Sequence, residues 1–466
     1  MPEQFQAVEV ADFKPEQVEC FALNWFTAMA RTPEQGMALK NHFMEKLRES
    51  PQTAELAVTP VLLSLTCWIF DDHKCLPQKR SDLYRDGVDL LLQQWDEGRG
   101  ISRDSGCDRH RQLTLEERKR LLSYVAVRKF EQSENFVLFE EAEICGYIAE
   151  HLQISVEEGR SVLQTIAEQH GLLIERVHGI WSFSHLTFQE YLTAFFLSGQ
   201  ADWATLVNSI FQQHWREVFL LLSEITVDID TLIFLMKQKI DLHIASIEKI
   251  QCFLSWLERK AMHINASYKK AAIRAFGYTF TLSHSIEIDF EYAYRLSTDL
   301  IFERDFSFES VLIPNEEQKQ TPKAFLVPLD LAVAIDPKIE QDLENVDNFF
   351  LGLTFAPNSY ELAKTRQDLP DRNSSEIELK EWWRTCGRDW IEKLKTVLEK
   401  YRSFKYKWQF NDEQKQYLEQ YYYGNYLLLK CLNNSYRVSE EMKKNIEETL
   451  LLPIAEIEKR KSQILD

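Results

Sequence analysis

The sequence predicts a mainly α-helical protein: a four-helix domain, a winged-helix domain with a β-hairpin, and then a C-terminal helical array. Three observations lead to this fold class. The composition combines 45% hydrophobic and 27% charged residues with few Gly and Pro, as in a globular helical chain. Apolar residues recur at helical spacing along most of the 466 residues. Two short apolar runs around His178-Gly179 add one hairpin directly before a helix.

Residues 1–97 predict a short strand and the four-helix domain. Gln6–Val10 has strand character, and the helices that follow are expected at Pro15 to about Ala30, Pro33 to about Arg48, Thr59–Phe70 and Ser81–Asp96. Pro15 and Pro60 suit the first turn of a helix, because proline lacks the N–H that has no partner there. Thr59–Phe70 is apolar on every side, so we expect a buried helix.

Residues 98–200 predict the winged-helix domain. Its first part, Gly98–Leu113, is polar and reads as a linker, and three helices are then expected at Thr114–Gln132, Phe139–His151 and Val156–Gln169. Capping boxes mark the first and third helices, Thr114 with Glu117 and Ser155 with Glu158. Three helices before a hairpin is the element order of a winged helix.

The stretch from Gly171 to Leu197 organises this domain. Gly171 suits the C-terminal end of the third helix, and the strands Leu172–Val177 and Ile180–Ser184 then flank a tight two-residue turn. By strand alternation Trp181, Phe183 and His185 share one face, and Ser182 and Ser184 the other. The next helix is expected to begin with a capping box of Thr187 and Glu190 and a hydrophobic staple of Leu186 and Tyr191.

His185 thus stands just ahead of a helix N-terminus, where free N–H groups and the helix dipole favour anions. Two interpretations follow from the residues. His185 is either a core histidine that orders the corner between strand and helix, or a phosphate contact.

The segment FSHLTFQEYLTAFFL, residues 183–197, closely resembles the winged-helix motif of NACHT-family signalling NTPases. The resemblance implies that His185 contacts the β-phosphate of bound ADP. It also implies that residues 1–97 hold a remnant of the last strand of the NACHT domain and then a first helical domain, whose proline lies near adenine, and Pro60 matches that position. The alternative for Pro60 is an ordinary helix-start proline.

Residues 201–313 are expected to form further antiparallel helices, with segments at His214–Ile225, Thr231–Ile240, Ile250–Ala261 and Tyr268–Phe276. Two of them, HWREVFLLL and YKKAAIRAF, resemble the second helical domain of bacterial NACHT proteins. Residues 314–466 predict a C-terminal helical region with polar loops, Pro314–Pro322 and Pro357–Glu376, around an apolar segment at Ala324–Ile335. The run Tyr421–Tyr423 indicates a packing surface rather than a platform for bases.

The net charge and the cysteine pattern argue against several classes of protein. The formal net charge of −19 argues against a general nucleic-acid or anionic-membrane binder. Eight Cys without a C-x-x-C pair indicate neither a zinc site nor a disulfide framework, and Cys107 with His110 reads as a polar loop. No apolar run approaches 18 residues and no signal peptide is evident, so we expect a soluble, cytoplasmic protein.

A winged helix most often binds DNA, so a DNA-binding regulator is an alternative function. The third helix, residues 155–171, offers Glu157, Glu158 and Glu168 against a single Arg160. Such a helix repels phosphates, which opposes this alternative.

A phosphate-binding loop of the G-x-x-x-x-G-K-[ST] type is absent, since no Gly in the sequence is followed by Lys. We therefore expect no catalytic residues and no enzyme activity for this chain alone, and no metal. The chain is expected to be the downstream part of a split or truncated gene, or a separate regulatory piece. ADP or ATP would bind only with a P-loop NACHT domain, supplied in cis or in trans.

The leading hypothesis is a regulatory and oligomerisation part of a NACHT-type NTPase that acts in signalling and, in bacteria, in defence. A helical scaffold with no nucleotide role is the other alternative.

Overall fold

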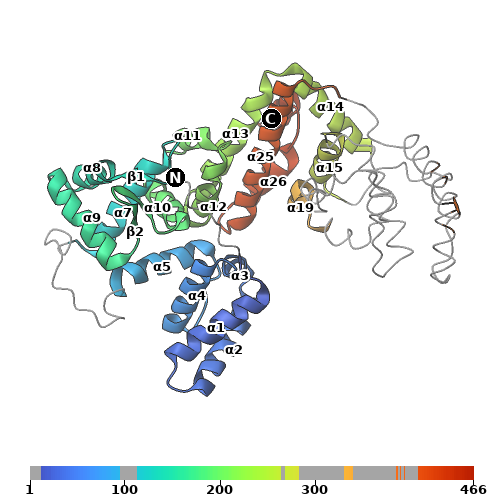
Figure 1. The fold of residues 1–466 in the computed structure, drawn as a ribbon. Coiled ribbons are helices and arrows are strands. Elements are labelled where there is room, and N and C mark those ends of the chain that lie inside the picture. The colour runs from blue at the N-terminus through green and yellow to red at the C-terminus, as the bar shows by residue number, and fades with distance from the viewer. Residues whose placement is uncertain are drawn as a thin grey trace. The chain divides into compact units, whose positions relative to one another are not determined.

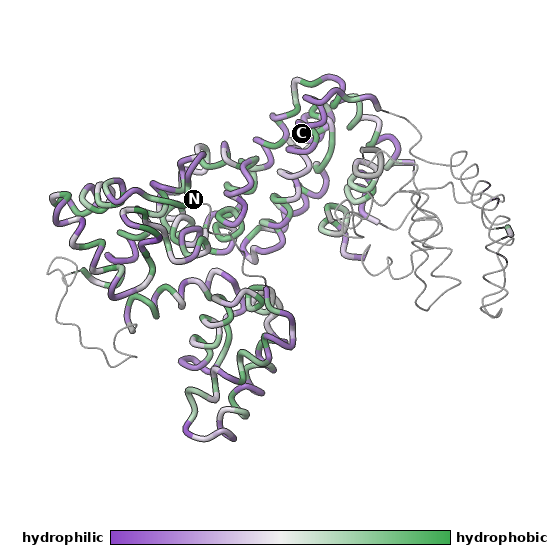
Figure 2. Tube along the Cα trace, viewed as in Figure 1, coloured by the Kyte–Doolittle hydropathy of each residue, from purple (hydrophilic) through white to green (hydrophobic). Residues whose placement is uncertain are grey.

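A computed structural model describes residues 12–94, 113–263, 268–282, 330–338 and 408–465, with single residues at 382, 385, 386, 389 and 393. The chain divides into two compact units (Figure 1). Unit 1 comprises Met1–Trp203 and Gln212–Val227, and unit 2 comprises Ala204–Phe211 and Asp228–Asp466. Hydrophobic and hydrophilic residues alternate along most helices of both units (Figure 2), as amphipathic packing requires.

Unit 1 begins with the helices α1 (Pro15–Met29), α2 (Pro33–Glu49), α3 (Pro51–Leu56), α4 (Pro60–His73) and α5 (Arg80–Gln94). The four helices expected from the sequence are present, and α3 is an additional short one. Each of α1 to α4 has proline in its first turn. Phe26 and Phe43 are fully buried, and each ring lies within 5.7 Å of the Phe70 ring. Aromatic packing of this kind holds the group together.

The winged helix follows in the order α7 (Leu115–Phe130), β1 (Phe139–Glu140), α8 (Glu141–Leu152), α9 (Val156–His170), β2 (Leu173–Val177), β3 (Ile180–Phe183) and α10 (Leu186–Gln200). The strands form an antiparallel sheet in the order β1-β3-β2. Gly179 adopts φ +76° in the turn between β2 and β3, and Val177 pairs with Ile180 across it. The tight hairpin at His178-Gly179 is therefore confirmed.

The expected caps of α7 and α9 are also confirmed. Thr114 with Glu117 and Ser155 with Glu158 form capping boxes in which each side chain satisfies a free backbone N–H. Gly171 ends α9 in a left-handed conformation, φ 62°.

The strand β1 corrects the expected helix at Phe139–His151. Phe139 and Glu140 pair with Trp181 and Ile180 of β3, so α8 begins only at Glu141. The two-residue strand was missed because its partner lies about forty residues downstream, beyond any local pattern. The expected alternation along β3 is also incomplete, since Ser182 is buried together with Trp181 and Phe183.

Two further elements complete the described part of unit 1: η3 (Gln213–Trp215) and α12 (Arg216–Ile225). A short helix, α11 (Trp203–Leu206), spans the boundary between the units. Helix α10 packs against α7, α12 and α5, so it lies at the centre of unit 1.

The described elements of unit 2 are η2 (Val207–Ser209), α13 (Ile229–Ala245), α14 (Glu248–His263), α15 (Lys270–Leu282), α19 (Asp330–Ile335), α25 (Asp412–Asn434), α26 (Glu440–Thr449) and α27 (Ile454–Leu465). The helical segments expected in residues 229–282 are thereby confirmed. Tyr421 is fully buried, and the ring of Tyr422 stacks on Tyr278 at 6.2 Å. The tyrosine run is therefore a packing surface, as predicted.

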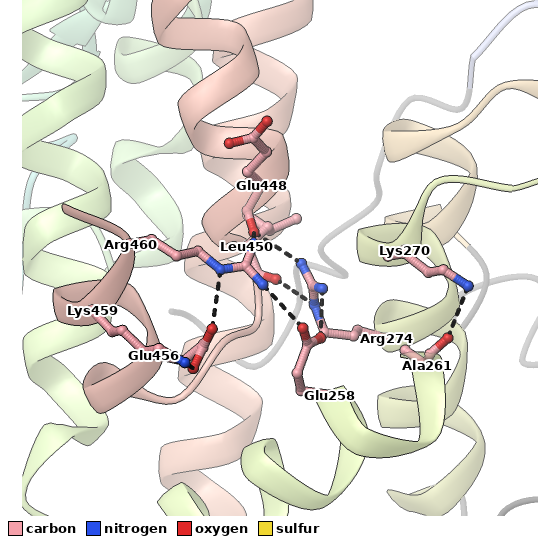
Figure 3. A network of polar contacts seen from close by, with 9 residues as sticks. All are labelled: Glu258, Ala261, Lys270, Arg274, Glu448, Leu450, Glu456, Lys459 and Arg460. Atoms are coloured by element: carbon pink, nitrogen blue, oxygen red, sulfur yellow. Dashed lines mark hydrogen bonds and ion pairs between the residues drawn. The ribbon is translucent and has the colours of Figure 1, made fainter. Parts of the chain in front are cut away.

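A polar network joins four helices of unit 2 (Figure 3). Arg274 of α15, which is 2% exposed, donates to the carbonyl oxygens of Leu450 at 2.9 Å and Glu448 at 3.3 Å. Arg460 of α27 also donates to the Glu448 carbonyl, at 2.9 Å, and both arginines pair with Glu258 of α14. The two cations thus meet the C-terminal end of α26, where the helix dipole is negative.

Several sequence-based expectations lie outside the described residues: the strand at Gln6–Val10, nearly all of the linker at Gly98–Leu113, the Cys107–His110 loop and the polar loops after residue 314. Within the described ranges, no helix has the length and apolarity needed to cross a bilayer. The same ranges contain no cluster of three potential metal ligands.

Candidate functional site

The candidate site is the corner where β3 turns into α10. His185 is the N-cap of α10, with extended backbone angles of φ −138° and ψ 142°. Its carbonyl accepts from the N–H of Phe188 at 3.2 Å, which closes the first turn. The histidine therefore stands at the helix N-terminus itself, as the sequence predicted.

The capping box expected at Thr187 and Glu190 is wrong, and so is the staple. Since α10 already begins at Leu186, Thr187 lies inside the first turn and cannot cap it. Leu186 is the first helical residue and is 39% exposed. Glu190 is buried instead of reaching back to the helix start. The sequence pattern fits a helix that begins at Leu186 as well as one that is capped by Thr187, and the packing of α10 decides for the first.

The imidazole of His185 is half-buried. Its ring lies edge-on to the Phe188 ring, with 6.1 Å between the ring centres. Within the described part of the chain, neither ring nitrogen has a hydrogen-bond partner. Burial lowers the pKa of His185, and the nearby positive charge of Arg176 lowers it further. The imidazole is therefore neutral at pH 7 and has one N–H to donate.

Arg176 is a neighbour of this corner that the sequence analysis did not single out. Its guanidinium donates to Ser182 Oγ at 2.8 Å and to the Ser184 carbonyl at 3.1 Å. A positive charge therefore lies beside the helix N-terminus and His185. A sequence pattern that could have indicated Arg176 is a basic residue near the turn of a hairpin whose second strand ends at a histidine.

Pro60, the second predicted site residue, begins α4. It is partly exposed, and the preceding Thr59 donates its hydroxyl to Asp12 Oδ1 at 3.1 Å. The structure thus confirms a helix-start proline and leaves its contact with adenine a prediction. His185 and Pro60 stand at the starts of different helices, and in the described residues no hydrogen bond or ring contact joins them.

The outer face of α9 is acidic. Glu157 and Glu168 are exposed, and Arg160 is engaged by Glu141 at 2.6 Å. In a winged helix that reads DNA this face would enter the major groove. Its charge is unsuited to a polyanion.

Comparison with protein families agrees with this geometry. The winged helix-turn-helix domain C-terminal to NACHT matches residues 80–197, from α5 to α10. The NACHT C-terminal helical domain 2 matches residues 359–453. The chain carries a NACHT C-terminal region. No curated protein and no solved structure matches it.

The matches also refine the layout of this NACHT C-terminal region. The winged-helix match includes α5, whereas the sequence analysis began that domain at residue 98. The match to helical domain 2 lies within residues 314–466, downstream of the range 201–313 that was expected to hold it. The expected domain boundaries stay a prediction.

A buried charge cluster in unit 1 of the NACHT C-terminal region was also missed. Arg80 of α5 forms ion pairs with Glu217 and Glu224 of α12. The charges of Glu217 and Arg80 also shift the pKa of Glu190 on α10. Its members come from three helices, and α5 precedes α10 and α12 by roughly a hundred residues in the sequence. Local patterns carry no signal for such a cluster.

Proposed function

We propose that this chain is the regulatory region of a NACHT-type signal-transduction NTPase, in which the winged helix contacts ADP held by a nucleotide-binding domain. The observation that carries the proposal is His185. It occupies the N-cap of α10, half-buried, and its ring nitrogens have no hydrogen-bond partner among the described residues. A half-buried imidazole without a local partner is free to donate to an added ligand.

The chemistry of the corner suits a phosphate. The first N–H groups of α10 have no helical acceptor, and the helix dipole places positive potential there. The His185 imidazole can donate one hydrogen bond to a phosphate oxygen, and an approaching anion favours its protonated form. ADP would then hold the winged helix against the nucleotide-binding domain, and its release would favour an open, signalling state.

We further propose a partner and a cellular setting for this chain. The partner is a P-loop NACHT domain, in cis or in trans, and the complete protein oligomerises. A role in bacterial defence signalling in the cytoplasm follows from the same family. The chain by itself is expected to hydrolyse neither ATP nor GTP.

The test is ADP affinity, measured by calorimetry with a P-loop NACHT domain supplied on the same chain or in trans. His185→Leu should weaken ADP by roughly tenfold to a hundredfold, the worth of a charge-assisted hydrogen bond. His151→Leu is the matched control, because His151 is also partly buried in the winged helix and its ring packs on Tyr124 at 4.9 Å. Equal affinity of His185→Leu and wild type would leave His185 a structural residue.

A further inference from the structure

The hairpin contains an irregularity at Arg176. Glu175 pairs with Trp181 and Val177 pairs with Ile180, so the register shifts between them and Arg176 has no partner on β3. A bulge of this kind bends a strand and re-aims a side chain, and bulges are common beside functional sites. Here the bulge directs a long, charged side chain back across β3 toward the start of α10.

One guanidinium then engages three consecutive residues. Arg176 Nε donates to Ser182 Oγ at 2.8 Å, and its terminal nitrogen donates to the carbonyl oxygens of Phe183 at 3.3 Å and Ser184 at 3.1 Å. Ser182 is fully buried and donates its own hydroxyl to the Phe183 carbonyl at 2.7 Å. The fixed fork of arginine can span such a set of acceptors, whereas the single ammonium of lysine cannot.

These acceptors immediately precede His185. We propose that Arg176 is a positioning residue, whose guanidinium holds the backbone of Phe183 and Ser184 and so fixes the direction in which the His185 imidazole leaves the strand. This inference rests on the proposed function, because positioning matters only if His185 meets a ligand. It adds a residue and a role to that function: Arg176 presents His185 to phosphate without being required to touch the nucleotide.

The charge of Arg176 acts together with its hydrogen bonds. Among the described residues on β2 and β3 and on the helices packed against α10, it is the charged group that shifts the His185 pKa, which it lowers. The histidine therefore stays neutral until an anion arrives. Hydrogen bonding and charge can be separated by substitution, since Arg176→Lys keeps the charge and loses the fork, whereas Arg176→Gln loses both.

The first experiment uses the full chain without nucleotide. Histidine Cε1 is labelled with carbon-13, and the His185 signal is identified by its absence in His185→Leu. We expect the His185 pKa to rise in Arg176→Gln and to stay near wild type in Arg176→Lys. Amide hydrogen exchange in a peptide covering residues 182–188 should be roughly tenfold faster in both variants, as local opening becomes easier.

Arg120→Gln is the matched control, because Arg120 is an exposed arginine of the same domain that pairs with Glu116 one turn away. It should change neither readout. If Arg176→Gln leaves both the His185 titration and the amide exchange as in the control, the inference is wrong.

The second experiment measures ADP affinity with the P-loop domain supplied. Arg176→Gln and Arg176→Lys should each weaken ADP by roughly tenfold, about the loss of one charge-assisted hydrogen bond. If ADP affinity is insensitive to His185→Leu, the proposed function fails, while the titration and exchange data still decide on the link between Arg176 and His185. If His185→Leu weakens ADP and both Arg176 variants bind as wild type, the positioning role is excluded.

Discussion

The guanidinium of Arg80 lies 2.5 Å from the carboxylate of Glu217, in a part of unit 1 where two further carboxylates are buried. Glu224 accepts from the Ser81 N–H at 2.8 Å, and Glu190 is 9% exposed. Arg80 thus pairs with Glu217 and Glu224, and its charge also acts on Glu190. Burial and the charge of Glu217 raise the pKa of Glu190 to about 8, so this side chain is largely protonated at neutral pH.

Glu190 should therefore make stability fall as the pH rises from about 4.5 to about 8. A carboxyl with a raised folded-state pKa stabilises the fold fully below about pH 4.5, and this contribution is lost as pH rises through about 8. Glu190→Gln keeps a neutral side chain at every pH. We expect it to match wild type near pH 5 and to exceed it at pH 9 by about 2 to 4 kcal/mol in urea unfolding.

Glu157→Gln serves as the control for this prediction, because Glu157 is exposed on α9. Its difference from wild type should not vary between pH 5 and pH 9. A Glu190→Gln protein that is less stable than wild type at both pH values would show that the carboxylate is needed in its charged form.

Two glycines of the winged helix should respond oppositely to alanine. A Cβ on Gly159 of α9 would lie 2.8 Å from the carbonyl oxygen of Cys145 on α8, so the helices would have to separate. A Cβ on Gly146 of α8 would meet nothing within 4 Å. We expect Gly159→Ala to destabilise by about 1 to 3 kcal/mol and Gly146→Ala to stabilise by about 0.5 to 1 kcal/mol. Thermal unfolding of the two variants side by side gives the comparison, and equal shifts would contradict it.

Arg274 should be a charged residue on which the stability of unit 2 depends strongly. Removing its side chain in Arg274→Met takes the Arg274 donor from the Leu450 carbonyl in a buried place, and leaves Arg460 as the donor to Glu258 and to the Glu448 carbonyl. The expected loss in the free energy of unfolding is about 3 to 5 kcal/mol. Lys415→Ala, which breaks an exposed pair with Asp412, should cost under about 1 kcal/mol in the same urea experiment. Similar losses for both would refute a special role for the Arg274 network.

The chain should not bind duplex DNA in a salt-dependent way. The outer face of α9 presents Glu157 and Glu168, and Arg160 is paired with Glu141. Few counterions could be released on such a surface, so fluorescence anisotropy should show no sub-micromolar binding at low salt. Tight binding that falls steeply with added salt would restore the DNA-binding alternative.

The sequence was most informative where structure depends on near neighbours. The capping boxes of Thr114 and Ser155 and the turn at Gly179 involve residues within a few positions of each other, and each was predicted. His185 was placed correctly for the same reason, because a strand and a helix meet there. Thr187 and Glu190 carried an equally good local signal and misled, since the apolar packing of α10, which buries Phe188, Tyr191 and Leu192, outweighs a cap worth about 1 kcal/mol.

Features that depend on distant residues could not be predicted. The strand β1 exists because Phe139 and Glu140 find Trp181 and Ile180, and the Arg80 cluster joins α5 to α12 across 137 residues. Arg176 combines a local and a non-local feature. It is close to His185 in sequence, but its role depends on a register shift in the hairpin that no residue pattern predicts.

The separation of Arg274 from its acceptors has a consequence during protein synthesis. The carbonyls of Glu448 and Leu450 follow it in the chain by 174 and 176 residues. At ribosomal rates of roughly 5 to 20 residues per second, α15 emerges on the order of ten to thirty seconds before α26 exists. Throughout that interval the guanidinium must stay hydrated, so α15 cannot settle into its final place. The described helices of unit 2 are therefore expected to reach their final packing only after α26 has been synthesised, and a chaperone could protect α15 until then.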